Sequence, residues 1–530
     1  MDVVETSIQG QDSGVETFDA EAVNSKENRA LYEAREKIHP KRATGPFRRF
    51  KWIVMLITLG IYYVTPWLRW DRGSGLPDQA VLLDMANRRF YFFFIEIWPH
   101  EFFYVAGMLV MAGIGLFLVT SVLGRAWCGY TCPQTVWVDL FLVVERYFEG
   151  DRNARIKLDA APWNSSKVTK RAAKHVAWLL ISVATGGAWI FYFADAPTLF
   201  VEIFTGQAAF VAYATVGVLT ATTYIFGGWM REQVCTYMCP WPRIQAAMLD
   251  ENSLTVTYND WRGEPRSRHA KRMRREGKPT GDCVDCNACV AVCPMGIDIR
   301  DGQQMECITC ALCIDACDGV MQKLGLEKGL ISYATLNDYD ANMALAGASK
   351  NIHEPKIVPA NIRNKDGKLS NRVAHFSWSS IFRVRTLVYL AIYCAIGLAI
   401  IFSLLMRDRL DVKVLHDRNP QFVMLSDGSI RNGYELKILN MKGEAQQFLI
   451  TAGGLLSPLI SEAGVTSGQS GWIVTDVEPN KLKSVRLFVT MPKNRLNRSS
   501  TDFTFNVSHM GGTDRSTVEA KFEAPKDIGE

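Results

Sequence analysis

Hydrophobic residues along the chain are gathered in long blocks, which alternate with segments as polar as a soluble domain. Five blocks carry no charged residue and are long enough, or nearly so, to cross a bilayer as helices. These blocks are Trp52–Leu68, Phe102–Leu123, Val176–Ala194, Ala208–Met230 and Thr386–Met406. A helix buried in a soluble protein rarely runs so far without a charge. The pattern therefore predicts an α-helical membrane protein with five transmembrane helices.

Lys and Arg in the connecting segments predict the orientation of these helices. They are abundant before the first block, between the second and third blocks and after the fourth, whereas Asp195–Gln207 contains none. Loops rich in Lys and Arg remain in the cytoplasm, so the N-terminus and the region 231–385 are predicted to be cytoplasmic. An odd number of spans then places the C-terminal tail in the periplasm, outside a bacterial inner membrane.

One further apolar segment, Phe90–Trp98, is too short to span a bilayer and contains Glu96. It follows the first block, on the predicted outer side of the membrane. We therefore predict an interfacial or re-entrant segment rather than a sixth span.

The tail after the last block has a different pattern, with apolar and polar residues alternating over short runs. Examples are Glu435–Leu439, Val485–Val489 and Phe503–Val507, and turn residues such as Asn432-Gly433 lie between the runs. Short alternating strands of this kind are typical of an all-β immunoglobulin-like sandwich. The chain thus divides into residues 1–45, disordered and cytoplasmic; 46–250, a four-helix membrane domain; 251–382, a cytoplasmic loop; 383–408, the fifth helix; and 409–530, a periplasmic sandwich.

Composition changes this picture through the cysteines. The chain has 530 residues, a net charge of only +5 and 13 cysteines. Eight cysteines lie between Cys283 and Cys317, four form two short pairs, and Cys394 is alone. A secreted disulfide framework would spread its cysteines over a small fold, so this clustering indicates metal ligation instead.

The eight clustered cysteines form two C-x2-C-x2-C-x3-C runs, at about residues 275–325 of the cytoplasmic loop. This is the spacing of bacterial ferredoxins, in which the fourth cysteine of each run binds the other run's cluster. The predicted ligands are Cys283, Cys286, Cys289 and Cys317 for one [4Fe–4S] cluster, and Cys307, Cys310, Cys313 and Cys293 for the other. Zinc sites usually use well-separated C-x2-C pairs and fit this spacing poorly.

The remaining pairs lie in two C-x-Y-x-C-P motifs, Cys128 to Pro133 and Cys235 to Pro240, each just after the second span of a two-span hairpin. Their repetition indicates an internal duplication. Spacing i, i+4 predicts both thiols of a pair on one helical face, and each proline should distort the helix at the cysteine before it. Thiolates favour Cu(I), zinc or iron–sulfur clusters. Cys128, Cys132, Cys235 and Cys239 could bind copper, jointly hold a further cluster or act as dithiols.

A basic run from Arg262 to Lys278 precedes the ferredoxin segment. It is predicted to anchor the loop at anionic lipid or to dock an acidic electron donor. Nucleic acid is not expected, because no groove-reading element accompanies the charges.

Four stretches together resemble the FixG/RdxA family, accessory proteins for assembly of cbb3-type cytochrome c oxidase. They are RAWCGYTCPQTVWVDLF, CTYMCPWPRIQ, CVDCNACVAVCPMGIDIRDGQQMECITCALCIDACD and DGSIRNGYELKILN. The resemblance implies a membrane cupric reductase that converts Cu(II) to Cu(I) for the oxidase. It implies as partners a cytoplasmic electron donor, a copper transporter or chaperone, and oxidase subunits. It also carries the family's cluster ligands to the eight ferredoxin cysteines and its paired thiols to Cys128, Cys132, Cys235 and Cys239.

Two other functions fit the residues. One is a quinol-linked electron-transfer subunit of a respiratory chain, with quinone held among the spans. The other is a non-enzymatic assembly scaffold or redox sensor. In that case the clusters are structural or regulatory, and the sandwich binds oxidase subunits.

Overall fold

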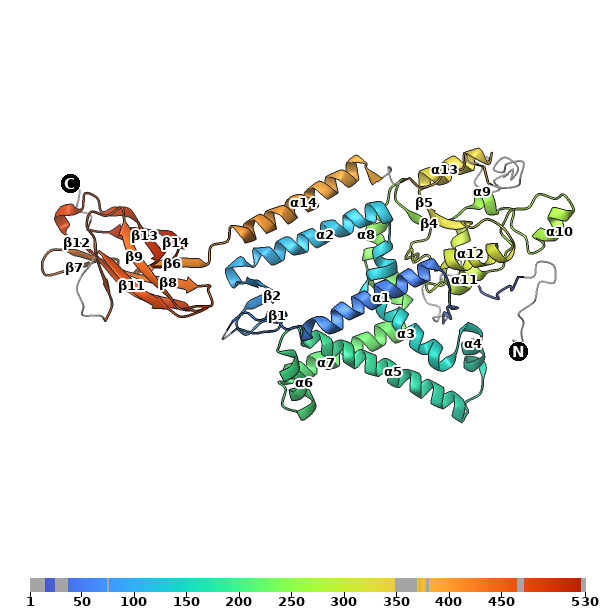
Figure 1. Ribbon diagram of the computed structural model, residues 1–530, viewed down its shortest axis with the longest axis horizontal. Coiled ribbons are helices and arrows are strands. Elements are labelled where there is room, and N and C mark those ends of the chain that lie inside the picture. Colours follow the sequence, from blue (N-terminus) through green and yellow to red (C-terminus); the bar gives the residue numbers. More distant parts are fainter. Residues whose placement is uncertain are drawn as a thin grey trace. The chain divides into compact units, whose positions relative to one another are not determined.

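The computed structural model describes residues 15–23, 37–73, 76–347, 369–370, 372–377, 381–464 and 471–525. They form two compact units. One contains residues up to 70 together with 79–398, and the other contains 71–78 together with 399–530. The first unit holds the apolar helices and the ferredoxin segment, and the second holds the β-rich tail (Figure 1).

Among the described residues, four helices are long and apolar enough to cross a membrane. They are α1 (Pro46–Val64) with the short helix η1 (Thr65–Trp67); α2 (Phe103–Leu123), preceded by η2 (Pro99–Glu101); α7 (Phe210–Thr223) with its continuation η4 (Tyr224–Met230); and α14 (Val384–Leu405). The first part of α14 lies along α2 (Figure 1), where a Cβ on Gly115 would be 3.2 Å from the Tyr393 ring. Apolar residues dominate the outer surfaces of these helices, as expected for helices in contact with lipid.

The predicted span Val176–Ala194 does not form a separate apolar helix. Its first part, 176–190, forms the end of α5 (Ser165–Ile190), whose first turns carry Lys167, Lys170, Arg171 and Lys174. This helix is not among the four that are apolar enough to span. The count of five spans therefore stays a prediction.

The segment around Phe90–Trp98 is made of strands. It belongs to a three-stranded antiparallel sheet of β1 (Val81–Asp84), β2 (Arg89–Phe92) and β3 (Ile95–Ile97). Tyr91 and Ile97 are buried, and Arg89 pairs across the sheet with Glu96, with an Nη1–Oε1 distance of 3.4 Å. The interfacial or re-entrant position of this segment stays a prediction.

Further helices connect the apolar ones, and the paired-thiol motifs lie before two of them. These helices are α3 (Pro133–Glu149), α4 (Arg152–Ala160), α6 (Ala196–Thr205) and α8 (Trp241–Met248). Two cysteine motifs thus lie at helix junctions, between α2 and α3 and between η4 and α8.

The ferredoxin segment is closed by a strand pair, β4 (Thr255–Tyr258) with β5 (Ile331–Ala334). Between these strands, α11 (Ala288–Val292) and α12 (Leu312–Lys323) each begin near the end of a three-cysteine loop. Three further helices, α9 (Asp260–Gly263), α10 (Ala270–Arg275) and α13 (Leu336–Leu345), flank them.

Part of the N-terminal region is ordered against this segment. Phe18 N donates to Cys286 O (3.0 Å), and Lys41 N donates to Ala291 O (2.7 Å). The predicted disorder of residues 1–45 therefore does not apply to 15–23 and 37–45, and the rest of that range lies outside the described residues.

The tail is an all-β sandwich, as predicted. One sheet has the order β10-β12-β8-β6, with β7 also pairing with β8, and the other has the order β11-β9-β13-β14. The strands are β6 (Leu410–His416), β7 (Val423–Met424), β8 (Ile430–Asn440), β9 (Gln446–Gly453), β10 (Leu459–Glu462), β11 (Trp472–Val477), β12 (Leu482–Met491), β13 (Ser500–His509) and β14 (Arg515–Glu523). Burial alternates residue by residue along β8, and Tyr434, Phe448 and Phe505 fill the core between the sheets.

Candidate iron–sulfur and thiol site

The two loops of the ferredoxin segment gather their thiols around two neighbouring cavities. One cavity is lined by the four cysteines predicted for the first cluster, Cys283, Cys286, Cys289 and Cys317. The other is lined by the four predicted for the second cluster, Cys293, Cys307, Cys310 and Cys313. Cys289 also borders the second cavity, so the two are adjacent. Each cavity thus receives three thiols from one loop and the fourth from the other run.

The backbone of both loops has the same unusual conformation. Asp285 (φ 49°) and Asn287 (φ 56°) flank Cys286, and Thr309 (φ 54°) and Ala311 (φ 59°) flank Cys310. Left-handed residues other than glycine are costly and mark places where the surroundings impose the geometry. Here they turn backbone N–H groups toward sulfur, because the N–H of Ala288 bonds Cys286 and that of Thr309 bonds Cys307. Such inward N–H groups suit an anionic cluster.

The spacing of the thiols suits a cluster better than a single ion. Over the described ranges, no three His, Cys, Asp or Glu side chains are gathered closely enough to hold one metal ion. A cubane instead separates its four thiolates widely, and each cavity presents four. The residues therefore fit two [4Fe–4S] clusters, and the zinc alternative has no preformed site. The copper site predicted at the paired thiols has no preformed counterpart either.

Charges around the first cavity are paired. Arg300 reaches Asp285 (Nη1–Oδ1 2.7 Å) and Asp298 (Nη2–Oδ2 2.5 Å). Part of the basic run is also internal, because buried Arg262 pairs with Asp282 at 2.7 Å. The run is therefore only partly the exposed surface that the sequence predicted.

The first paired-thiol motif is a π-helical turn, Trp127–Thr131, instead of the expected α-helix. Cys132 N donates to Trp127 O across this wider turn (2.9 Å). Cys132 itself is extended (ψ 128°), as expected before proline, and Pro133 begins α3. The second motif repeats this arrangement with the π turn Val234–Met238 and extended Cys239.

The first motif packs directly on the loop that carries the second cluster's ligands. A Cβ on Gly129 would lie 2.7 Å from Ile308 O and 3.1 Å from the Cα of Cys310, so only glycine fits. Tyr130 OH donates to Cys310 O (3.3 Å) and lies 3.3 Å from Tyr333 OH. Cys128, Ile308 and Cys310 share one apolar core. The first thiol motif and the loop that carries the second cluster's ligands are therefore packed directly against each other.

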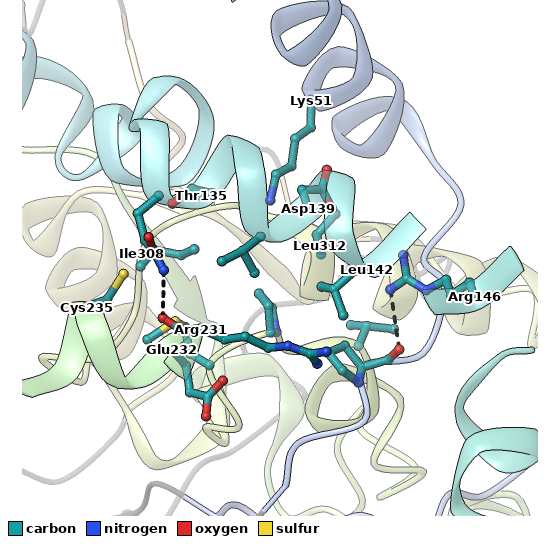
Figure 2. Close-up of a pocket in the computed structure, with 16 residues that line it drawn as sticks. Lys51, Thr135, Asp139, Leu142, Arg146, Arg231, Glu232, Cys235, Ile308 and Leu312 are labelled. Atoms are coloured by element: carbon teal, nitrogen blue, oxygen red, sulfur yellow. Dashed lines mark hydrogen bonds between the residues drawn. The ribbon is translucent and has the colours of Figure 1, made fainter. Parts of the chain in front are cut away.

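The second motif reaches the same loop across a cavity. Figure 2 shows Cys235 at one end of this cavity, beside Ile308, and Arg146 at the other end. Leu312 also lines it, and Lys51 and Asp139 extend into it from two helices. The cavity therefore joins the second thiol pair to the cluster loop.

In the tertiary structure the two thiol pairs lie close enough for one pair to affect the pKa values of the other. Burial and, to a smaller extent, the neighbouring Cys132 and Cys235 together raise the pKa of Cys128 to about 12. Burial likewise raises the pKa of Cys235 to about 12, with smaller contributions from Cys132 and Cys239. Without a bound metal, both thiols are therefore protonated at neutral pH.

Sequence reasoning missed several residues of this site. Gln245, in α8, accepts a hydrogen bond from Cys128 Sγ (3.0 Å) and is fully buried. Tyr333, in β5, donates to Thr309 O (2.8 Å). Gln245 is the last residue of the CTYMCPWPRIQ stretch, but nothing in that stretch indicates its contact with Cys128, and Tyr333 lies outside the stretches quoted above. The Nδ1 atom of His175 lies 2.9 Å from Tyr224 OH.

Comparisons with known proteins agree with this architecture. A family described as "4Fe-4S dicluster domain" matches residues 230–336, and a "4Fe-4S binding domain" matches residues 105–146, which include the first thiol pair. The tail, residues 400–525, matches the family of the IG-like fold at the C-terminal of FixG. A solved FixG-related protein from Vibrio parahaemolyticus covers 22% of this chain and 98% of its own, at 23% identity and a TM-score of 0.19.

Two kinds of relative match along most of the chain. Nitrogen fixation protein FixG of Rhizobium meliloti is 62% identical over 513 residues, 97% of this chain and 97% of its own length. Protein RdxB and protein RdxA of Cereibacter sphaeroides are 52% and 50% identical, covering 88% and 92% of this chain and 91% and 97% of their own lengths. With its iron–sulfur domains and its immunoglobulin-like tail, the chain belongs to the FixG/RdxA family.

Proposed function

We propose that this iron–sulfur protein passes electrons from a cytoplasmic donor to its paired thiols and there reduces Cu(II) to Cu(I), for assembly of a cbb3-type oxidase. The proposed cluster ligands are Cys283, Cys286, Cys289 and Cys317, and Cys293, Cys307, Cys310 and Cys313. The proposed copper-handling thiols are Cys128, Cys132, Cys235 and Cys239. The protein would lie in the bacterial inner membrane, with the ferredoxin segment cytoplasmic and the sandwich periplasmic.

One observation carries this proposal: the first thiol motif is packed against the cluster loop, with Gly129 on Ile308 and Tyr130 on Cys310. An electron leaving the second cluster therefore has a covalent and hydrogen-bonded path to Cys128 without crossing solvent. The adjacency of the two cavities gives the first cluster a similarly short step to the second.

The chemistry needs one electron for each copper ion. Each [4Fe–4S] cluster, when bound, stores and releases one electron. The thiols supply soft sulfur ligands, which favour Cu(I) over Cu(II) and so favour the product. Because burial raises the pKa of Cys128 and Cys235, binding of copper would displace a proton from each.

The test is anaerobic reduction of Cu(II) by the purified protein, with dithionite as the reductant. Changing Cys128, Cys132, Cys235 and Cys239 together to serine should abolish most of the reduction while iron and acid-labile sulfide stay at two clusters. Cys394→Ser is the matched control, because this cysteine is exposed and outside the site. Unchanged reduction in the quadruple variant would exclude the thiols as the copper site.

A second candidate role for the four thiols is joint ligation of a further cluster. The match of a 4Fe-4S binding domain to residues 105–146 favours it, since that stretch contains Cys128 and Cys132. Iron analysis separates the candidates, because two cubanes bring about eight iron atoms and three bring about twelve. A loss of about four irons in the quadruple serine variant would support this second role.

A further inference from the structure

Arg125, three residues before Cys128, joins three parts of the site. Its guanidinium donates through Nη1 to the carbonyl oxygens of Met305 and Cys307, the latter at 3.1 Å. Nη2 donates to Pro242 O at 2.7 Å, just after the second thiol motif. One side chain thus connects the first motif, the second motif and the loop that presents Cys307.

The charge of Arg125 is buried and has no ion pair within the described part of the chain. The residue is 5% exposed, its Nε has no hydrogen-bond partner, and its three carbonyl partners are uncharged. The groups that act electrostatically on Arg125 are the sulfurs of Cys307 and Cys128, which are anionic once they bind metal, and, more weakly, the carboxylate of Glu306. The positive charge therefore lies between the proposed second cluster and the first thiol pair.

The arginine beside the first cavity differs in this respect. Arg300 acts on Cys289, but its charge is offset by the carboxylates of Asp285 and Asp298. The cation near the second cavity thus has no ion pair within the described part of the chain, whereas the cation near the first cavity is paired with two carboxylates.

We propose that Arg125 is a positioning residue that raises the reduction potential of the second cluster and fixes the thiol motifs against its loop. The inference rests on the proposed function, through the assignment of Cys293, Cys307, Cys310 and Cys313 as ligands. A cubane with four thiolates is anionic and gains one more negative charge on reduction. A buried cation nearby favours the reduced state, and charge is one of the factors that set cluster potentials. An electron then rests preferentially on the cluster beside the thiols.

The experiment is an anaerobic potentiometric titration of the full-length protein, followed by EPR spectroscopy. Arg125→Gln removes both the charge and the guanidinium hydrogen bonds to the three carbonyl oxygens. Arg125→Lys keeps the charge but loses most of these hydrogen bonds. Arg231→Gln is the matched control. Arg231 precedes Cys235 at the related place of the second motif and is equally buried, but it is paired with Glu145 at 2.9 Å.

Arg125→Gln is expected to lower one of the two midpoint potentials and to leave the other unchanged. The expected shift is at least a tenfold change in the reduction equilibrium, which is about 59 mV for a one-electron couple. Arg125→Lys and Arg231→Gln should leave both potentials near those of the unmodified protein. If Arg125→Gln loses the second cluster, its potential is not measurable and the test passes to Arg125→Lys. An unshifted midpoint potential of the second cluster in Arg125→Lys then supports the role of the charge.

Two results would overturn the inference. One is a pair of unchanged potentials in Arg125→Gln with full iron content, and the other is a potential in Arg125→Lys that falls by tenfold or more. Neither depends on copper, so a failure of copper reduction leaves this test intact. A wrong ligand assignment would be distinguishable, because substitution of Cys310 or Cys313 would then leave both clusters in place.

Discussion

The two C-x-Y-x-C-P motifs are duplicates in sequence and in local structure, yet their surroundings differ. Both are π turns that end in an extended cysteine before proline. In the first, Tyr130 is 7% exposed and bonds the cluster loop, whereas the equivalent Tyr237 in the second is 57% exposed. Gly129 touches that loop, whereas Thr236 occupies the equivalent position of the second motif.

The difference teaches that duplication provided two thiol pairs but only one docking surface for the ferredoxin segment. Under the proposed function, the first motif would receive the electron from the cluster loop. The second borders a cavity and leaves its tyrosine and Met238 exposed, so under the same proposal it is the better placed of the two to meet copper or its carrier. Three further changes would break or sharpen this comparison.

The largest effect on copper reduction is expected from Gly129→Val. Its side chain would collide with backbone atoms of Ile308 and Cys310, which cannot move away as a flexible side chain could. We expect the motif to separate from the loop, with copper reduction falling at least tenfold and partial loss of iron. Overpacking of this kind costs about 1–3 kcal/mol or more.

The control for this change is Thr236→Val, which adds no comparable bulk at the equivalent position of the second motif. It should keep iron content and copper reduction near those of the unmodified protein. Equal losses in both variants would mean that the two motifs are not functionally distinct.

A stability effect is expected from Glu145→Gln. Glu145 is fully buried and binds both Arg231, beside the second motif, and Arg155, each at 2.9 Å. Removing one partner from a buried charge network leaves uncompensated charges and typically costs about 3–5 kcal/mol. Thermal unfolding in detergent should show a clearly lower midpoint temperature. An unchanged iron content would show that the ferredoxin segment is intact and that the destabilised region is the one around the second motif.

Half-buried Glu202 in α6 offers a control for that substitution, since Glu202→Gln removes a carboxylate that forms no ion pair within the described residues. Its unfolding midpoint should not move. A shift as large as that of Glu145→Gln would contradict the argument from buried charge.

The smallest effect is expected from Tyr130→Phe, which removes hydrogen bonds to Cys310 O and Tyr333 OH without creating a cavity. The cost should be about 0.5–1.5 kcal/mol, measured as faster loss of the clusters' absorbance during denaturation. Tyr237→Phe should have no measurable effect, because that side chain is exposed. A larger effect at Tyr237 would reverse the assignment of the docked motif.

The sequence alone determined the local and periodic features of this protein. Cysteine spacing predicted which thiols would surround each cavity, since a short loop leaves few ways to present three sulfurs to one cubane. Proline predicted the extended Cys132 and Cys239, because its ring restricts the residue before it. Alternation over β8 and β13 predicted the sandwich, because one face of each strand must be buried.

Tertiary structure alone decided which duplicate docks on the cluster loop. The choice depends on contacts between residues 180 or more positions apart, such as Arg125 with Cys307 and Tyr130 with Cys310. It also decided the partners of Cys128 and Arg125, since the stretch CTYMCPWPRIQ contains Gln245 and Pro242 but does not indicate which residues they contact. A repeated motif has the same local conformational preferences in both copies. Because protein interiors are closely packed, however, only one of the two copies can pack against a given surface.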